Sequence, residues 1–229
     1  MLPGDAFAIV LLMDHDLYED EDDDFCCGRA YGGSRVAVVS TARYHPVLDE
    51  FAGIDYSHMW PASHCKTYAD GLCAGKGLKV TTSGSGVPSS SASPLRRAID
   101  AASRTNPNLA AEDHRALWFS RLARTVVHEL GHCLGMGHCT YYACVMQGTS
   151  GMAEDVRQPP YLCPVRLAKI THAVAGELGC GSDTEKARYV KARYDGLADF
   201  CGRWQHVGMF AGYEAWLRAR LEDLSSSEK

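Results

Sequence analysis

The sequence has no apolar run long enough to cross a membrane and no surplus of positive charge. Its longest apolar stretch, AFAIVLLM at residues 6–13, is far shorter than the about 20 residues of a membrane-spanning helix. No basic segment precedes this stretch and an acidic one follows it, which is more typical of a buried strand than of a secretory signal. The net charge of −5 argues against nucleic-acid binding through counterion release. We therefore expect neither a membrane nor a nucleic acid as a partner.

Three common functional signatures are also missing. The GTSG segment at residues 148–151 has the wrong spacing for the G-x-S-x-G elbow of a serine hydrolase. The acidic run at residues 20–24 lacks the spaced ligands and the glycine of an EF-hand loop, so a solvated loop is favoured. A nucleic-acid-binding zinc ribbon would need a second C-x-x-C pair, and the sequence has none.

What the sequence does contain is an ordinary globular composition and ten cysteines. Hydrophobic residues make up 46% and charged residues 22% of the 229 positions, which excludes a chain that is disordered throughout. This length favours one domain with two lobes. Cysteines without a secretory signal indicate a reducing, cytoplasmic location, where they bind metal more often than they form disulfides.

Strand-like segments come first in the chain and helix-like segments come last. Residues 6–13 and 35–44 carry the apolar and β-branched side chains of strands, whereas Ser and Gly dominate a flexible insertion at about 71–94. This order predicts an α+β fold in a single domain, 1–229, with an N-terminal lobe at 1–135 and a mostly helical C-terminal lobe at 136–229. The expected helices cover residues 94–105, 111–134, 165–179, 184–200 and 204–224.

The string VVHELGHCLGMGH has the spacing of a metal site. On a helix, His128 and His132 lie one turn apart on the same face, and Glu129 is rotated by about 100° from His128. Gly135 lets the chain leave the helix and turn back, so that His138 can supply a third nitrogen. Three neutral nitrogens and one open position suit a hydrolytic zinc ion, which lowers the pKa of bound water toward about 7.

Sulfur-containing residues follow the histidines. Met146 comes eight residues after His138 and is expected to form a hydrophobic floor under the metal site, as in metzincins. Cys139 and Cys144, separated by four residues, could provide two thiolates to one zinc ion, and Cys163 could join them. The alternative is that each of these cysteines is an ordinary buried thiol.

Taken together, these residues resemble the archaemetzincins, a family of zinc proteases whose motif is H-E-x-x-H-x-x-G-x-x-H-C-x-x-x-x-C-x-M followed by C-x-x-C. The resemblance implies a metzincin-like zincin with a mixed, twisted sheet and an active-site helix. It also implies a catalytic zinc on the three histidines, a glutamate general base and a structural zinc on three cysteines. The matching positions are His128, Glu129, His132, Gly135, His138, Cys139, Cys144, Met146 and Cys163.

The sequence departs from the family pattern at two places. Arg166 stands where the last cysteine is expected, so a structural zinc would need its fourth ligand from elsewhere, or the site is empty and packing alone holds the loop. The family also places another strand and a backing helix before the strand expected at residues 6–13. Without these two elements, one face of the sheet would be under-covered. The candidates for the fourth ligand are Cys133, Cys180, Cys201 and His172, of which Cys133 is disfavoured by its direction on the helix.

We expect a zinc-dependent peptidase that hydrolyses peptide bonds with a metal-activated water and Glu129 as the general base. Its peptide or protein substrate would lie along an edge strand near residues 35–41. The alternative is a catalytically weak or inactive zinc-binding interaction module of the same fold. No pattern indicates the oligomeric state or assigns a substrate-binding residue. Five residues could contact substrate or an oxyanion, but each is more typical of a surface or packing role: Arg35, Arg43, Tyr44, Tyr141 and Tyr142.

Overall fold

The computed structural model divides into two compact units. The first contains Met1–Ile54 and Leu109–Cys180, and the second contains Asp55–Asn108 and Gly181–Lys229. The lobe boundary expected after Gly135 stays a prediction. The insertion expected at 71–94 lies almost entirely outside the described residues, and so does Cys180. The structure describes residues 5–22, 24–31, 34–64, 93–105, 111–179 and 181–226.

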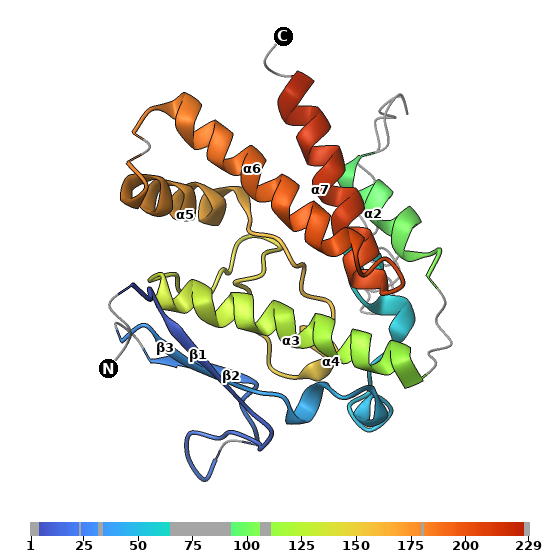
Figure 1. Ribbon diagram of the computed structural model, residues 1–229. Coiled ribbons are helices and arrows are strands. Elements are labelled where there is room, and N and C mark those ends of the chain that lie inside the picture. The colour runs from blue at the N-terminus through green and yellow to red at the C-terminus, as the bar shows by residue number, and fades with distance from the viewer. Residues whose placement is uncertain are drawn as a thin grey trace, which may run out of the picture. The chain divides into compact units, whose positions relative to one another are not determined.

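A small mixed sheet forms one side of the first unit. Its strand order is β1-β3-β2, with β1 parallel and β2 antiparallel to β3. With the helices described below, this sheet confirms the α+β class (Figure 1). On the edge strand β1, the side chains of Ile9, Leu11 and Leu12 are exposed, and the under-coverage expected for one face of the sheet stays a prediction. The strands are β1 (Ile9–Met13), β2 (Gly28–Tyr31) and β3 (Val36–Ser40).

The position of β3 contradicts one expectation from the sequence. The segment at 35–41 was expected to be an edge strand that binds substrate, but β3 lies in the centre and has a neighbour on each side. The strand also stops at Ser40, and the chain continues into the 3-10 helices η1 (Ala42–Tyr44) and η2 (Pro46–Leu48). The edge strands among the described residues are therefore β1 and β2.

Helix α3 (Ala111–Cys133) lies across the sheet and packs against β2 and β3 (Figure 1). Its apolar stripe predicted the helix, and Leu122 joins a core that includes Val39, Tyr44 and Met152. A buried ion pair also fixes the helix, because the guanidinium of Arg121 donates to both carboxylate oxygens of Asp49 at 2.7 Å.

The chain leaves α3 as the sequence indicates. Gly135 has a φ angle of +78°, which favours glycine, and the following residues turn back along the helix. A four-residue helix, α4 (Met152–Asp155), had no periodic signal in the sequence. Helix α5 (Pro164–Glu177) was expected, and the Cys163 side chain caps its N-terminus by accepting from the backbone N–H of Arg166.

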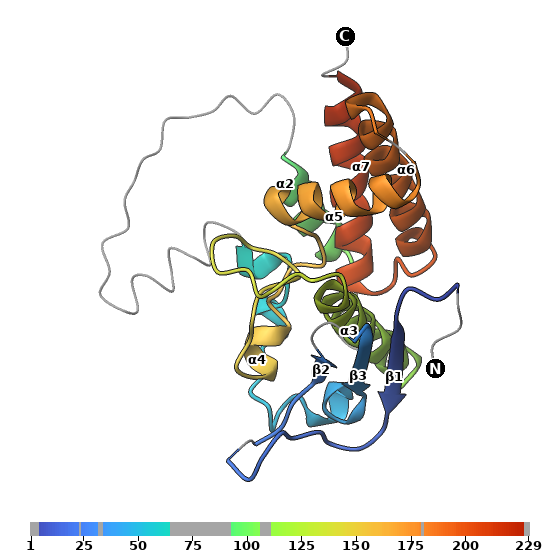
Figure 2. The same ribbon diagram turned by 90° about the vertical axis from the view of Figure 1, so that its left-hand side faces the viewer.

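The second unit is mainly helical, and α7 packs against both α2 and α6 (Figures 1 and 2). The helix expected from Trp204 starts only at Gly208, because a turn with a Val207 N–H to Trp204 carbonyl hydrogen bond precedes it. No helix in the described parts of the chain is long and apolar enough to span a bilayer. The elements of this unit are η3 (Tyr56–His58), η4 (Ala62–His64), α2 (Pro94–Ala102), α6 (Asp183–Gly202) and α7 (Gly208–Ser226).

Candidate active site

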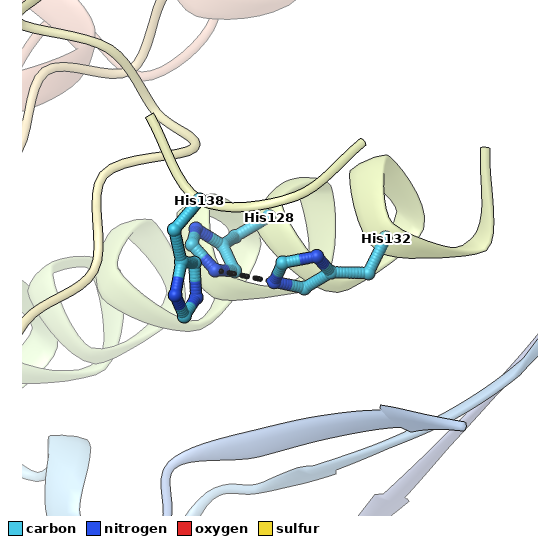
Figure 3. Close-up of side chains that lie close together, drawn as sticks. All are labelled: His128, His132 and His138. Carbon is cyan, nitrogen blue, oxygen red and sulfur yellow. Dashed lines mark hydrogen bonds between the residues drawn. The ribbon is translucent and has the colours of Figure 1, made fainter. Parts of the chain in front are cut away.

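The three predicted histidines come together at one point in the first unit. His128 and His132 extend from α3, and His138 comes from the segment after Gly135, with the three rings facing one another (Figure 3). One ring nitrogen from each histidine lies within 4.8 Å of the others. The ring centroids are 4.7 to 5.3 Å apart. The spacing in the sequence thus predicted the cluster correctly.

Main-chain carbonyl groups set the orientation of two of these rings. Nδ1 of His128 lies 2.6 Å from the carbonyl oxygen of Val145, and Nδ1 of His132 lies 2.6 Å from that of Met136. A carbonyl oxygen only accepts hydrogen bonds, so both Nδ1 atoms carry the proton. Metal-binding histidines commonly make this kind of contact, because it directs the lone pair of Nε2 toward the ion.

The distance between two Nε2 atoms indicates whether a cation fits this site. Those of His128 and His132 are 3.0 Å apart, the contact dashed in Figure 3. In neutral rings both atoms are acceptors, so the contact is favourable only with a proton or a cation between them. Burial lowers the pKa of His128 to about 4, so its ring is neutral at pH 7. The donor set therefore fits a divalent ion with nitrogen ligands.

Glu129 is buried beside the histidines rather than turned toward bulk solvent. Its Oε2 atom is buried and accepts no hydrogen bond from the described residues. Burial raises the pKa of Glu129 to about 7, and the nearby Arg29 guanidinium and the Ala30 N–H partly offset this increase. A carboxyl group with a pKa near 7 can both accept and return a proton at neutral pH.

Glu129, His128 and His138 line a common cavity of about 290 Å³. One wall comes from β2, which contributes Gly28 and Arg29, and the loop that follows Met146 forms another. This space is large enough for part of a peptide chain. The other lining residues are Glu19, Phe25, Cys26, Cys27, Tyr44, Thr125, Gln147, Gly148, Thr149, Ser150, Gly151, Asp155 and Gln158.

Met146, which the sequence predicts to form a hydrophobic floor under the metal site, packs against α3. Its side chain is fully buried and packs so tightly against α3 that a methyl group added at Gly131 would meet its Cε atom at 2.8 Å. The backbone around Met146 supports the site as well, because its carbonyl accepts from the N–H of Cys139 at 2.6 Å. Together with the Val145 carbonyl, this segment contacts the histidine cluster through its main chain.

The three predicted cysteines form a second cluster. The sulfur atoms of Cys139, Cys144 and Cys163 lie within 4.8 Å of one another, and all three side chains are buried. The Sγ atoms of Cys139 and Cys163 are 3.9 Å apart. The described cysteines are free thiols, and the cluster contains no fourth sulfur or imidazole from the described residues.

Arg166 lies next to this cysteine cluster. Its backbone N–H faces Sγ of Cys163 at 3.5 Å, and its guanidinium donates to the carbonyl oxygen of His138 at 2.9 Å. Among the fourth ligands proposed from the sequence, Cys133 and His172 are not part of the cluster, and Cys201 belongs to the other unit. Arg166 therefore links the cysteine cluster to the segment that carries the third histidine.

The residues expected to contact substrate lie in varied surroundings. Tyr44 is fully buried and lines the cavity, but its hydroxyl forms a hydrogen bond with the hydroxyl of Thr125. Arg43 pairs with Asp16. The remaining three do not line this cavity: Arg35 precedes β3, and Tyr141 and Tyr142 are exposed.

The sequence did not indicate several residues that shape the cavity. Asp155 and Gln158 line it, and Asp155 forms a buried ion pair with Arg124 of α3. Arg29 also lines it and pairs with Glu19. These residues belong to or follow short elements, α4 and β2, which carry too few residues for a periodic pattern. The carbonyl groups that orient the histidines leave no side-chain signal at all.

Comparison with known proteins agrees with the peptidase class that the histidine cluster and its neighbouring glutamate indicate. Residues 102–172, which include the histidine cluster and the cysteine cluster, match the model of peptidase family M54. The chain is similar to archaemetzincin-2 from Rattus norvegicus (28% identical over 173 residues) and from Homo sapiens (30% over 172 residues). It is also 30% identical to archaemetzincin-1 from Mus musculus over 182 residues. The chain thus matches peptidase family M54 over residues 102–172 and is similar to archaemetzincins over most of its length.

These alignments cover most of this chain but much less of the relatives. They include 75% of the chain for both archaemetzincin-2 proteins and 77% for archaemetzincin-1. The same alignments span 38% of archaemetzincin-2 and 29% of archaemetzincin-1. The chain thus spans less than two fifths of the length of these relatives. No solved structure matches the chain significantly.

Proposed function

We propose that this chain is a metzincin-like zinc peptidase that binds one zinc ion through His128, His132 and His138. The observation that carries the proposal is the convergence of three imidazole nitrogens, since two of these histidines, His128 and His138, also line one cavity with the buried carboxylate of Glu129. The match of residues 102–172 to a peptidase family supports the reaction class. The methionine packed under the histidine helix supports the metzincin type.

Glu129 is proposed to act as the general base. When bound, zinc would acidify a water molecule and polarise the carbonyl of the scissile peptide bond. Glu129 would take the proton from the attacking water and return it to the departing amine. Two features support this role: its Oε2 atom has no hydrogen-bond partner among the described residues, and its pKa of about 7 lets the group change protonation state at neutral pH.

The proposed substrate is a peptide or protein segment that binds along β2. In the described sheet, β2 is paired on one side only, by β3, so its other edge can form main-chain hydrogen bonds with an extended peptide. This strand lies beside the site, because Gly28 and Arg29 line the cavity with Glu129 and His128. An extended segment on β2 would therefore pass the proposed base.

A peptide-library digest tests the function. The wild-type chain should cleave peptides, and a chelator should abolish the cleavage. Glu129→Gln should retain zinc but lose roughly 10²- to 10⁴-fold in kcat, the usual contribution of a positioned general base. The matched control is Glu177→Gln on the exposed side of α5, which should cleave like the wild type. Zinc binding without cleavage would instead support an inactive zinc-binding module, and full activity of Glu129→Gln would refute the assigned base.

A second, structural zinc at Cys139, Cys144 and Cys163 is a separate proposal. Three buried sulfur atoms within 4.8 Å of one another support it, since thiolates are preferred zinc ligands. Its fourth ligand would have to come from outside the described cluster. Two zinc ions in the wild type and one in Cys144→Ser would support this site. One zinc ion in both chains would leave only the histidine site.

A further inference from the structure

Gly28 on β2 lies directly against the side chain of Glu129. A Cβ atom at this position would be 2.6 Å from Oε1, 2.8 Å from Cγ and 2.9 Å from Cδ of the glutamate. Carbon atoms do not approach this closely in folded proteins, and Cγ is not the freely moving end of the side chain. The strand can therefore approach the glutamate only because residue 28 has no side chain.

The sheet leaves β2 little freedom to move away from α3. Gly28 is paired with Val39 and Ala30 with Ala37 in the antiparallel ladder to β3, and both partners are fully buried. The Cys26 thiol additionally donates to the carbonyl oxygen of Gly28 at 2.8 Å. Any group added at residue 28 would therefore displace Glu129 rather than the strand.

Two contacts of β2 thus act on the same carboxylate. The backbone N–H of Ala30 favours its charged form, and the bare backbone at Gly28 leaves the space that Oε1 and Cγ occupy. The glutamate itself is only 4% exposed and lines the cavity with His128 and His138. A displaced carboxylate would change its distance from any water held at the histidines.

We propose that Gly28 is a positioning residue for Glu129: it admits the carboxylate between β2 and α3 and thereby fixes the base beside the histidine cluster. This inference rests on the proposed function, because it assigns Gly28 a role through the general base. Its steric part is independent of catalysis, since Gly28 and Glu129 are in contact whether or not the chain cleaves peptides.

The kinetic test compares Gly28→Ala with Gly137→Ala, where an added methyl group meets nothing within 4 Å. Gly28→Ala should keep its zinc and its KM but lose about 10²-fold in kcat, the usual cost of misplacing a catalytic group by about 1 Å. Gly137→Ala should keep the wild-type kcat. A Gly28→Ala variant with wild-type kcat, or one that loses zinc in parallel with activity, would overturn the proposal.

A double-mutant cycle separates positioning from general damage. Glu129→Asp removes one methylene group and so makes room for the added methyl. In that background, Gly28→Ala should reduce kcat by less than about 5-fold, because the two changes interact. An equal loss of kcat in both backgrounds would contradict the role. If Gly28→Ala alone does not fold, the double variant Gly28→Ala/Glu129→Asp should still fold. If Glu129→Asp folds but the double variant does not, this result would also contradict the positioning role of Gly28.

Thermal stability gives a readout that does not depend on activity. Without metal, Gly28→Ala should lower the melting temperature of the wild type by several degrees but that of Glu129→Asp much less. If the wild type cleaves no peptide yet this coupling is seen, the proposed function fails while the contact is supported. If the wild type is an active peptidase and the coupling is absent, the inference about Gly28 fails alone.

Discussion

At the scale of single residues, burial shifts the pKa values of His128 and Glu129 in opposite directions. It lowers that of His128 to about 4 and raises that of Glu129 to about 7, since burial disfavours both charged forms. In the metal-free protein, His128 therefore lowers the free energy of unfolding as the pH falls from 6.5 toward 4, because over this range its imidazole is protonated mainly in the unfolded chain. The glutamate does the reverse: it contributes stability below pH 4.5 that is lost as the pH rises to 7.

These opposite effects predict a pH-dependent phenotype for Glu129→Gln. In the metal-free wild type the two contributions largely offset each other between pH 4.5 and 6.5. The variant retains only the histidine effect, so its stability should fall more steeply than that of the wild type on acidification. Thermal melts in the presence of a chelator would measure the two slopes, with Glu177→Gln as the control. Parallel curves for Glu129→Gln and the wild type would contradict the prediction.

Most of the candidate site could be predicted because it depends on local geometry. His128 and His132 share a helix face by spacing alone, and the turn at Gly135 needs a residue that tolerates positive φ. The groups that orient them could not be predicted, because the carbonyls of Val145 and Met136 belong to the backbone and are available at every position. The contact of Gly28 with Glu129 depends on strand pairing, which residue types do not reveal.

At the scale of elements, α3 is closely packed against the segment that contains Met146. Gly131→Ala would place a methyl group 2.8 Å from Cε of Met146, and we expect it to reduce the free energy of unfolding by about 1–3 kcal/mol. The control is Gly196→Ala in α6, which has open space at its Cβ position and should stabilise the chain by up to about 1 kcal/mol. Urea unfolding compares them, and equal effects would contradict the proposed packing.

The buried pair between Arg121 and Asp49 ties α3 to the chain after β3. Asp49→Ala should reduce the free energy of unfolding by about 3–5 kcal/mol, because it leaves a buried guanidinium without its partner. Glu222→Ala removes the exposed carboxylate that pairs with Arg97 and should reduce the free energy of unfolding much less, because solvent screens this pair. Denaturant titrations of both variants check this difference, and a small effect of Asp49→Ala would show that the pair does not hold the helix.

The elements themselves were predicted to different extents. Long helices with a periodic apolar stripe, such as α3 and α5, were correctly expected within a few residues. The short strand β2 has no comparable pattern, and β3 was wrongly expected to be an edge strand. Which strand is central depends on pairing between segments far apart in the chain, and this cannot be read from local residue types.

At the scale of the whole molecule, the residues of the proposed site all belong to one compact unit. That unit combines the first 54 residues with Leu109–Cys180, so the strands and α3 meet although a long segment separates them in the sequence. The match to peptidase family M54 falls at 102–172, mostly within this unit. A cytoplasmic location, inferred from the cysteines, stays a prediction.

Zinc binding to the metal-free chain tests the central claim most directly. A titration against a chromophoric chelator should show that His132→Ala binds one zinc ion fewer per chain than the wild type. The thiol cluster does not affect this difference, because both chains retain it. If the wild type and His132→Ala bind the same number of zinc ions, the three imidazoles do not form a metal site and the account of this chain as a zinc peptidase is wrong.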